Sequence, residues 1–265
     1  MSNPLPATRT RVFDGQAQND FALLSGDRNP IHIDPVVARR SEVGPLIVHG
    51  MHTVLWALEE LTQIRSLQHP IAQLKARFKK SLYVGDELAL EIISRTLEIR
   101  LKLRVDGLVA TTVDIAFGES KRAAIWQGVA NDIPNAAWPL HPLELPFEQM
   151  EGASGWLAFA HGPDAAARSF PGLSAVIGAR RVSGLACISR LVGMVCPGLH
   201  SILAGFTVEA INEVDRIDAI RFKATSVDER FQLVSESVEG GGWSGKIESF
   251  ARVPSTAQPS MNSFP

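Results

Sequence analysis

An aspartate and a histidine, five residues apart in a turn-rich segment, are the pair in this sequence best suited to acid–base chemistry. The segment Phe21–Arg39 reads FALLSGDRNPIHIDPVVAR. Gly26 permits a positive φ, and the proline after Asn29 pushes that residue out of the α region, so we expect a stiff turn. Asp27 and His32 flank it, and a carboxylate beside an imidazole can share one water or hydroxyl as acid and base.

An ordinary loop is the competing interpretation of this segment. Ser, Gly, Asp, Asn and Pro are common turn residues, and a single histidine is often held structurally by hydrogen bonds. Composition and spacing leave both interpretations open. In either case Asp34 is expected to cap a short helix that has Pro35 at its first position.

Two similar apolar stretches predict two buried central helices that would position this segment. The first, Val48–Leu61, begins V-H-G-M, and the second, Val182–Val195, begins V-S-G-L. Both carry apolar residues at helical spacing around most of their circumference. Alternating, strand-like segments follow at 86–120 and 218–254, and an Asp-Gly dipeptide at 106–107 indicates a hairpin. The pattern predicts an α+β unit that occurs twice.

The same patterns divide the chain. A proline- and tryptophan-rich stretch between the halves indicates a linker, and the polar, proline-interrupted end indicates a disordered tail. We expect a first domain at 1–130, the linker at 131–155, a second domain at 156–253 and the tail at 254–265.

The composition excludes several classes of function. No apolar run approaches the roughly 18 residues of a membrane span, and the N-terminus lacks the apolar core of a secretory signal. A net charge of −2 without a basic block argues against a nucleic-acid surface. Cys187 and Cys196 are too few for a disulfide framework and lack metal-ligand spacing. We therefore expect a cytoplasmic globular protein without a membrane or nucleic-acid partner.

Three motifs stand in order in the first half. An aromatic residue followed by L-S-G-D-x-N-P-I-H-x-D occupies 21–34, V-H-G-M occupies 48–51, and R-F-x₆-G-D-x-L occupies 77–88. Together they resemble the MaoC-like (R)-specific enoyl-CoA hydratases, or hydratase 2, of the hotdog superfamily. The resemblance covers about 13–118, and in the second half it rests only on the order of helix and strands. It implies a double hotdog, in which each domain wraps a curved antiparallel sheet around a long central helix.

The resemblance also implies an activity. Family members interconvert (3R)-3-hydroxyacyl thioesters and trans-2-enoyl thioesters, carried on CoA or on the phosphopantetheine of an acyl carrier protein. By matching position, Asp27 and His32 would be the catalytic acid–base pair. The backbone N–H of Gly50 would bind the thioester carbonyl, since a helix N-terminus offers unpaired donors. Supporting roles would fall to Asn29, Ser25 and His49.

Two departures from the family pattern stand out. Related hydratases often carry a serine about two turns into the central helix, where this chain has Leu58. The second half lacks the G-D-x-N-P-x-H motif, and its His161 and Asp164 occur in reversed order at shorter spacing. We expect a degenerate second half that supplies packing and part of a substrate tunnel, with the site where the halves meet.

Several further expectations concern ligands and partners. No metal and no cofactor beyond the thioester carrier is expected, and the chain would be a pseudo-dimeric monomer or a homodimer. Arg180 and Arg181, just before the second helix, are candidate phosphate-binding residues or else solvated surface arginines. Two alternatives to a hydro-lyase remain: an acyl-thioester hydrolase, because a fold does not fix a function, and a non-catalytic acyl-thioester-binding or scaffolding protein.

Overall fold

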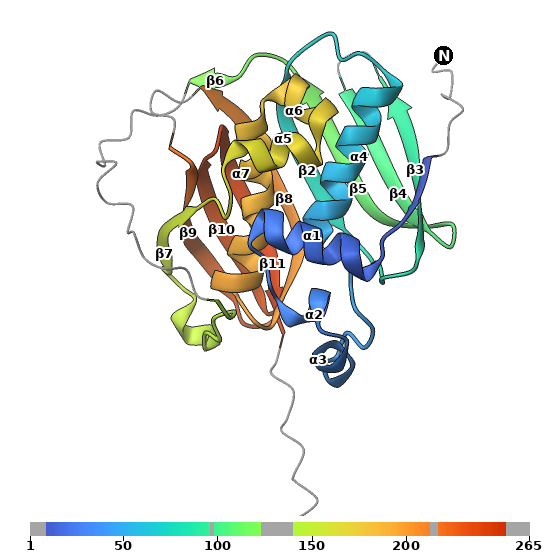
Figure 1. Ribbon diagram of the computed structural model, residues 1–265. Coiled ribbons are helices and arrows are strands. Elements are labelled where there is room, and N and C mark those ends of the chain that lie inside the picture. The colour runs from blue at the N-terminus through green and yellow to red at the C-terminus, as the bar shows by residue number, and fades with distance from the viewer. Residues whose placement is uncertain (1–8, 96–97, 123–139, 213–216, 253–265) are drawn as a thin grey trace, which may run out of the picture.

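The structure, a computed structural model, describes residues 9–95, 98–122, 140–212 and 217–252. In these residues eleven strands form one sheet in the order β1-β3-β4-β5-β2-β8-β11-β10-β9-β7, and the short β6 pairs with β8. All neighbouring strands are antiparallel except β6 and β8, which are parallel. The helices lie against this sheet (Figure 1).

The elements have the following bounds. The strands are Arg9–Val12 (β1), Ile71–Phe78 (β2), Glu87–Ser94 (β3), Glu98–Val105 (β4), Leu108–Phe117 (β5), Lys121–Arg122 (β6), Ser154–Ala158 (β7), Ser201–Asn212 (β8), Ala219–Asp228 (β9), Leu233–Gly240 (β10) and Trp243–Ala251 (β11). The helices are Gly15–Ser25 (α1), Pro30–Ile33 (α2), Pro35–Arg40 (α3), Gly50–Ile64 (α4), Pro163–Ser169 (α5), Pro171–Ile177 (α6) and Ala179–Arg190 (α7), with a 3₁₀ turn at Phe147–Gln149 (η2) and a π-helical turn at Leu191–Val195 (η3).

The strand order is the same in both halves of the sheet. Outward from the centre, the first half runs β2-β5-β4-β3-β1 and the second runs β8-β11-β10-β9-β7. The half-sheets join through β2 and β8, which pair from Gln73↔Glu209 to Arg77↔Gly205. Helix α4 lies against the first half-sheet and α7 against the second, and the two helices contact each other (Figure 1). The expected α+β hotdog architecture is confirmed, and its strand order occurs twice.

Local sequence accounts for the main elements. Ten of the fifteen residues of α4 are buried, which explains its apolar circumference. The predicted hairpin forms at 106–107, where both residues have positive φ and Val105 pairs with Leu108. Three consecutive glycines with positive φ, 240–242, make the corresponding turn between β10 and β11.

Some boundaries differ from those expected. Helix α7 begins at Ala179, three residues before the predicted start, and continues as the π-helical turn η3. Strand β7 begins at Ser154, inside the expected linker, because the prolines of that stretch end before it and β7 lies at the sheet edge. The rest of the linker up to 139 and the expected tail at 254–265 fall outside the described residues. The domain boundaries themselves stay a prediction.

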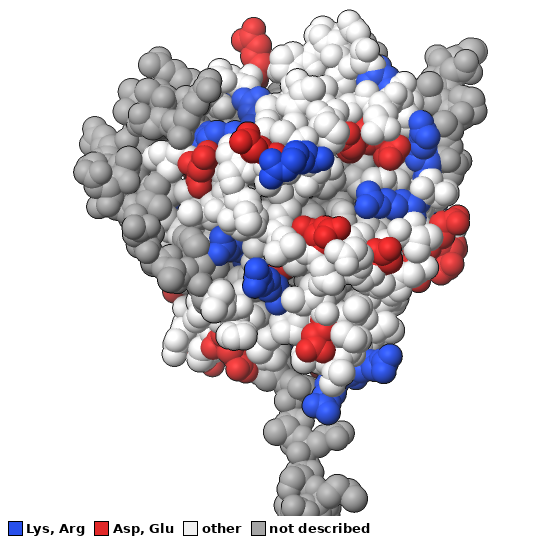
Figure 2. All heavy atoms as spheres, in the orientation of Figure 1, with Lys and Arg blue, Asp and Glu red and all other residues white. Residues whose placement is uncertain are grey.

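The surface carries charges of both signs. On the face seen in Figure 2, acidic and basic side chains are interspersed rather than gathered into one patch. None of the helices in the described ranges is long and apolar enough to cross a membrane.

Candidate active site

A tight turn after α1 directs Asp27 inward. Gly26 has φ 78 and donates its N–H to the carbonyl of Ala22 at 2.9 Å, which closes the helix. A Cβ at Gly26 would lie 2.8 Å from the Cβ of Ala160, so both the backbone angle and the space require glycine. The Ser25 hydroxyl donates to the carbonyl of Phe21 at 2.7 Å and accepts the N–H of Asp27 at 3.1 Å. Ser25 therefore supports the turn, as expected.

The rest of the segment is held by side-chain caps. Asn29 has φ −58 and ψ 126, outside the α region as predicted, and its Oδ1 accepts the N–H of Ile31 at 3.3 Å at the start of α2. Oδ1 of Asp34 accepts the N–H groups of Val36 and Val37 at 2.8 and 3.1 Å. The predicted N-cap, with proline at the first position of α3, is confirmed.

Asp27, His32 and Gly50 line one cavity of about 210 Å³. Its opposite wall comes from the second half, through η3 and the start of β8. The lining residues from the second half are Ser189, Val192, Gly193, the segment 201–204 and Phe250. Lys79 and Lys80 line the cavity as well. The three residues expected to act together are thus brought together, between the two halves.

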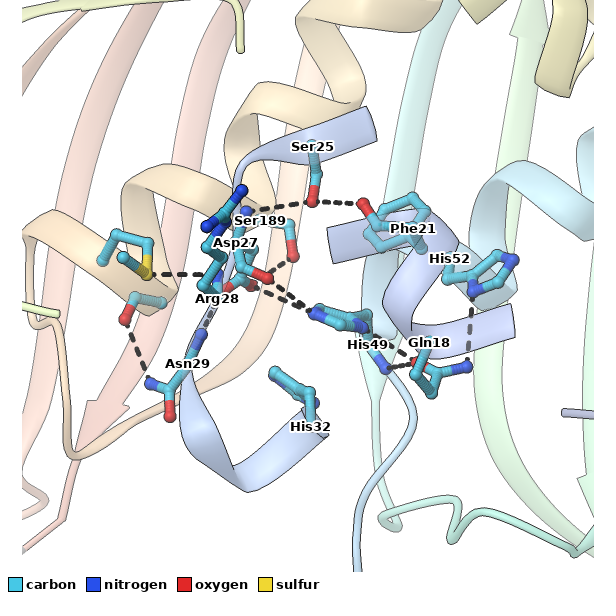
Figure 3. A network of polar contacts seen from close by, with 12 residues as sticks. Gln18, Phe21, Ser25, Asp27, Arg28, Asn29, His32, His49, His52 and Ser189 are labelled. Atoms are coloured by element: carbon cyan, nitrogen blue, oxygen red, sulfur yellow. Dashed lines mark hydrogen bonds and ion pairs between the residues drawn. The ribbon is translucent and has the colours of Figure 1, made fainter. Parts of the chain in front are cut away.

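Asp27 is buried and held by hydrogen bonds from both halves. Its side chain is 2% exposed. Oδ2 accepts the Ser189 hydroxyl at 2.7 Å, and Oδ1 accepts the Asn29 N–H at 3.1 Å (Figure 3). Burial raises the pKa of Asp27, and His32 and the Ser189 hydroxyl partly offset that rise. A carboxyl with a raised pKa can hold a proton and act as an acid near neutral pH.

His32 is oriented as a base. Its Nδ1 lies 2.8 Å from the carbonyl oxygen of Ile47. Because a carbonyl only accepts, Nδ1 carries the proton and Nε2 keeps its lone pair. Burial lowers the pKa of His32, and Asp27 partly offsets that fall, so the neutral form is favoured.

His49 supports the pair from behind. Its ring stacks on that of His32 with centroids 3.8 Å apart, and Figure 3 shows it between Gln18 and Asp27. Nδ1 lies 2.8 Å from Gln18 Oε1, and Nε2 lies 3.1 Å from the Asp27 carbonyl oxygen. Burial lowers the pKa of His49 well below its ordinary value, so the imidazole is neutral and donates to one of these acceptors. His49 does not line the cavity.

Gly50 begins α4 with its backbone open to the cavity. His49 occupies the N-cap position and makes no side-chain cap. In the described part of the chain, no group accepts the N–H of Gly50. A Cβ at Gly50 would lie 2.9 Å from Cε1 of Phe78, so a larger residue would press on that ring. An unpaired donor at the positive end of a helix suits an oxygen that gains negative charge.

The same cluster was tested as a metal site. Ligand atoms of Asp27, His32 and His49 all lie within 4.8 Å of one another. However, the two imidazole planes are 3.8 Å apart and inclined by only 25°. Ring lone pairs lie in the ring plane, so these two planes meet far beyond the roughly 2 Å of a metal–nitrogen bond. The stacked arrangement therefore does not fit a shared ion. That the protein uses no cofactor stays a prediction.

Residues of the second half that sequence analysis missed hold the Asp27 turn in place. A Cβ at Gly193 would lie 2.2 Å from Oδ1 of Asp27, so only glycine fits there. The Gly193 carbonyl would pair with the N–H of residue 197 in an α-helix, but Pro197 has none. It instead accepts Nδ2 of Asn29 at 3.0 Å, which fulfils the bracing role expected of Asn29.

Ser189 supplies the hydroxyl that α4 lacks. Leu58 is 1% exposed and belongs to the core. The serine beside Asp27 comes from α7, 162 residues away along the chain. The available signal was the serine's place on the second predicted helix, but no local pattern pairs it with Asp27.

Arg180 and Arg181 do not reach this cavity. Arg180 donates to the Ile217 carbonyl and forms an ion pair with Asp218 at 3.2 Å. Arg181 donates to the Ile211 carbonyl at 3.1 Å. Both guanidinium groups contact the sheet, and their binding of a phosphate stays a prediction.

Part of the chain is similar to known proteins. A family model described as "MaoC like domain" matches residues 2–113. The first half of the chain is thus similar to a MaoC-like domain. It is 33% identical over 82 residues to the mitochondrial 3-hydroxyacyl-[acyl-carrier-protein] dehydratase of Arabidopsis thaliana, across 30% of this chain and 47% of that protein. It is 31% identical over 84 residues to the peroxisomal hydratase-dehydrogenase-epimerase of Saccharomyces cerevisiae, across 32% of this chain and 9% of that protein. The chain thus spans less than half the length of these relatives.

Solved structures extend the likeness of fold beyond the MaoC-like domain to nearly the whole chain. A putative MaoC domain dehydratase from Chloroflexus aurantiacus J-10-fl has a TM-score of 0.63 at 10% identity, covering 96% of both chains. A second protein, described as a MaoC-like dehydratase, has a TM-score of 0.59 at 10% identity, covering 94% of this chain and 96% of its own. At this identity the likeness concerns the fold alone.

Proposed function

We propose that the protein is a hydro-lyase that interconverts (3R)-3-hydroxyacyl thioesters and trans-2-enoyl thioesters. The observation that carries the proposal is the cavity in which Asp27, His32 and the N–H of Gly50 converge. The dehydratase and hydratase names of the two curated relatives support the same reaction class. CoA and acyl carrier protein are both suitable carriers, and Lys79 and Lys80 give the cavity a positive charge that suits their phosphates.

Asp27 and His32 have complementary protonation states. Burial favours a protonated Asp27 and a neutral His32, so the pair holds one proton in the arrangement that dehydration requires. Nε2 of His32 would take the proton from the α carbon. The carboxyl of Asp27 would give its proton to the departing 3-hydroxyl, which leaves as water. Hydration runs the same transfers backwards, and a proton exchange between the groups or with solvent resets the pair.

The start of α4 would stabilise the intermediate charge. Loss of the α proton puts negative charge on the thioester oxygen, and the Gly50 N–H is the donor that faces it. The apolar wall contributed by Val192 and Leu203 would bind the acyl chain. This division gives chemistry to the first half and part of the binding surface to the second.

The test follows the enoyl-thioester absorbance after adding crotonyl-CoA to wild type and to Asp27→Asn. We expect decay with wild type and a loss of about 100-fold or more in the variant, the scale of general acid–base catalysis. Asp20→Asn is the matched control, because Asp20 is an exposed residue of α1. Undiminished activity in Asp27→Asn would contradict the assignment of the site.

The same assay separates the alternatives. Release of free CoA thiol without a hydrated acyl product would identify an acyl-thioester hydrolase. Saturable binding of crotonyl-CoA and of a crotonyl carrier protein without any turnover would identify a binding or scaffolding protein. Chiral analysis of the product tests the (3R) configuration.

A further inference from the structure

A second cavity lies in the second half and shares no lining residue with the cavity of Asp27 and His32. Its volume is about 530 Å³, within the range of roughly 300–1,000 Å³ typical of small-molecule sites. The segment around η2 forms one wall, and the ends of β8 and β11 form the other. Its apolar lining is Leu145, Pro146, Phe147, Met150, Pro197 and Ala251.

Arg252 is one of the lining residues of this cavity. Arg252 follows β11, and its backbone N–H donates to the carbonyl of His200 at 2.8 Å. Its side-chain Nε is buried and has no hydrogen-bond acceptor among the described residues. Burial lowers the pKa of Arg252, and the charge of Glu42 partly offsets that fall. A charged donor without an acceptor is costly, so an anion that bonded to the same guanidinium through its terminal nitrogens would be stabilised.

The other polar groups at the cavity are already paired. Nε2 of His200 lies 3.1 Å from Oε1 of Glu144. The side-chain amide of Gln232 donates to the carbonyl of Glu229 at 2.7 Å. Of the charged side chains in the described lining, Glu144 is therefore paired, whereas Nε of Arg252 is not. The planar fork of a guanidinium matches a carboxylate.

We propose that this cavity binds a small amphiphilic carboxylate, a compound with one carboxylate on a short apolar chain. Arg252 would hold the carboxylate, and the walls formed by Phe147, Met150 and Pro197 would hold the chain. This inference does not depend on the proposed reaction, because no residue of the cavity belongs to the Asp27 site.

Binding there would act on the first cavity through charge. Arg252 is one of the groups that lower the pKa of His32, after burial, while Asp27 raises it. An anion on Arg252 would neutralise that charge and raise the pKa of His32. Binding of a free carboxylate in the second cavity would thereby change the protonation of His32 in the first cavity.

The test is calorimetric titration of the full chain with octanoate and with octan-1-ol. We expect saturable binding of one octanoate, with octan-1-ol at least about tenfold weaker, because a charge-assisted hydrogen bond contributes on that scale. Arg252→Gln should lower octanoate affinity to the level of octan-1-ol. Arg230→Gln is the matched control, because Arg230 stacks on Phe231 at the β9–β10 turn, outside the cavity.

Two further variants keep the result attributable to this cavity. Met150→Trp should fill it and abolish octanoate binding, whereas Asp27→Asn should leave binding unchanged. Equal affinity for octanoate and octan-1-ol, unchanged binding by Arg252→Gln, or no saturable binding below about 10 mM would each overturn the proposal. Where octanoate binds, the NMR titration of His32 should move to higher pH, and this shift should be absent in Arg252→Gln.

Discussion

The two halves share a strand order but use the start of their central helix differently. In the first half, the N-terminus of α4 opens into the cavity through Gly50. In the second half, Trp243 covers the start of α7: its indole N–H donates to the Arg181 carbonyl at 2.9 Å, and the Arg181 guanidinium lies 5.8 Å from its ring centroid. The backbone of Gly241 also packs against Gly184 at the contact limit. A helix start can thus either receive a ligand or be sealed by packing.

The second half, in which the start of α7 is covered, still contributes to the site in the first half. Ser189 bonds the carboxylate of Asp27, and Gly193 leaves room for it while bonding Asn29. Met194 Sδ accepts the N–H of Arg28 at 3.2 Å. Three consecutive residues of the turn are therefore held by the end of α7 and by η3. The second half, whose sequence has no G-D-x-N-P-x-H motif, therefore helps to hold Asp27 in place.

The largest effect on the positioning of Asp27 by the second half is expected from a methyl group at Gly193. Gly193→Ala would place Cβ within 2.2 Å of Oδ1 of Asp27, so the carboxylate must move. We expect kcat for crotonyl-CoA hydration to fall by about 100-fold with a smaller change in KM, because a misplaced catalytic group weakens the transition state most. Gly162→Ala is the control, since nothing lies within 4 Å of a Cβ there. Equal kcat in both variants would show that η3 does not position Asp27.

Removing the Ser189 hydroxyl should have a smaller and more specific effect. Ser189→Ala deletes the 2.7 Å hydrogen bond that lowers the pKa of Asp27, so that pKa should rise. We expect about a tenfold loss of kcat and a pH–rate profile displaced to higher pH, because the one-proton state of the pair then persists to higher pH. Ser183→Ala, in the same helix, is the control, since the Ser183 hydroxyl is buried and has no hydrogen-bond partner in the part of the chain that the structure describes. A rate loss without a displaced profile would assign Ser189 a packing role only.

Local patterns predicted the parts of the site that depend on near neighbours. The αL glycine at 26, the extended Asn29 and the Asp34 cap follow from intrinsic backbone preferences, and each occurs as expected. The hairpin at 106–107 is predictable for the same reason.

Contacts between the halves were not predictable in this way. Ser189 and Gly193 meet Asp27 and Asn29 across more than 160 residues of chain, where spacing carries no signal. The widened turn η3 depends on Pro197, whose effect on the Gly193 carbonyl shows only once the helix end is known. Arg180 and Arg181 were singled out for their charge, but their acceptors lie 30 or more residues away along the chain, just before β9 and on β8.

Two buried carboxylates, Asp27 in the first half and Glu236 in the second, give a stability test. Asp27 has hydrogen-bond donors on both oxygens. Glu236 is fully buried, and among the described residues its oxygens have no nitrogen or oxygen donor, only the weak donor of the Cys196 thiol. Burial raises the pKa of Glu236 from 4.5 to about 8. The folded state therefore binds a proton that the unfolded state releases. The contribution of Glu236 to stability is greatest below about pH 4.5 and declines as the pH rises toward 8.

Glu236→Gln should flatten that decline. Between pH 5 and pH 8 we expect the Tm of wild type to fall by several degrees more than that of the variant, because the amide does not ionise. Glu239→Gln is the control, since Glu239 is partly exposed and paired with Arg221. Thermal melts that run parallel for wild type and Glu236→Gln across this range would contradict a protonated Glu236 in the fold.

The smallest effect is expected at the start of α7. Because Arg180 already bonds the Ile217 carbonyl and Asp218, Arg180→Gln should leave the KM for crotonyl-CoA within about twofold of wild type. Lys79 and Lys80 line the Asp27 cavity, so Lys80→Gln is the informative comparison, with an expected rise in KM of several-fold from a lost phosphate contact. If Arg180→Gln instead raised KM more than Lys80→Gln, the thioester carrier would cross the second half. The sealed helix start would then belong to the substrate path, and the two halves would share binding more equally than their structures indicate.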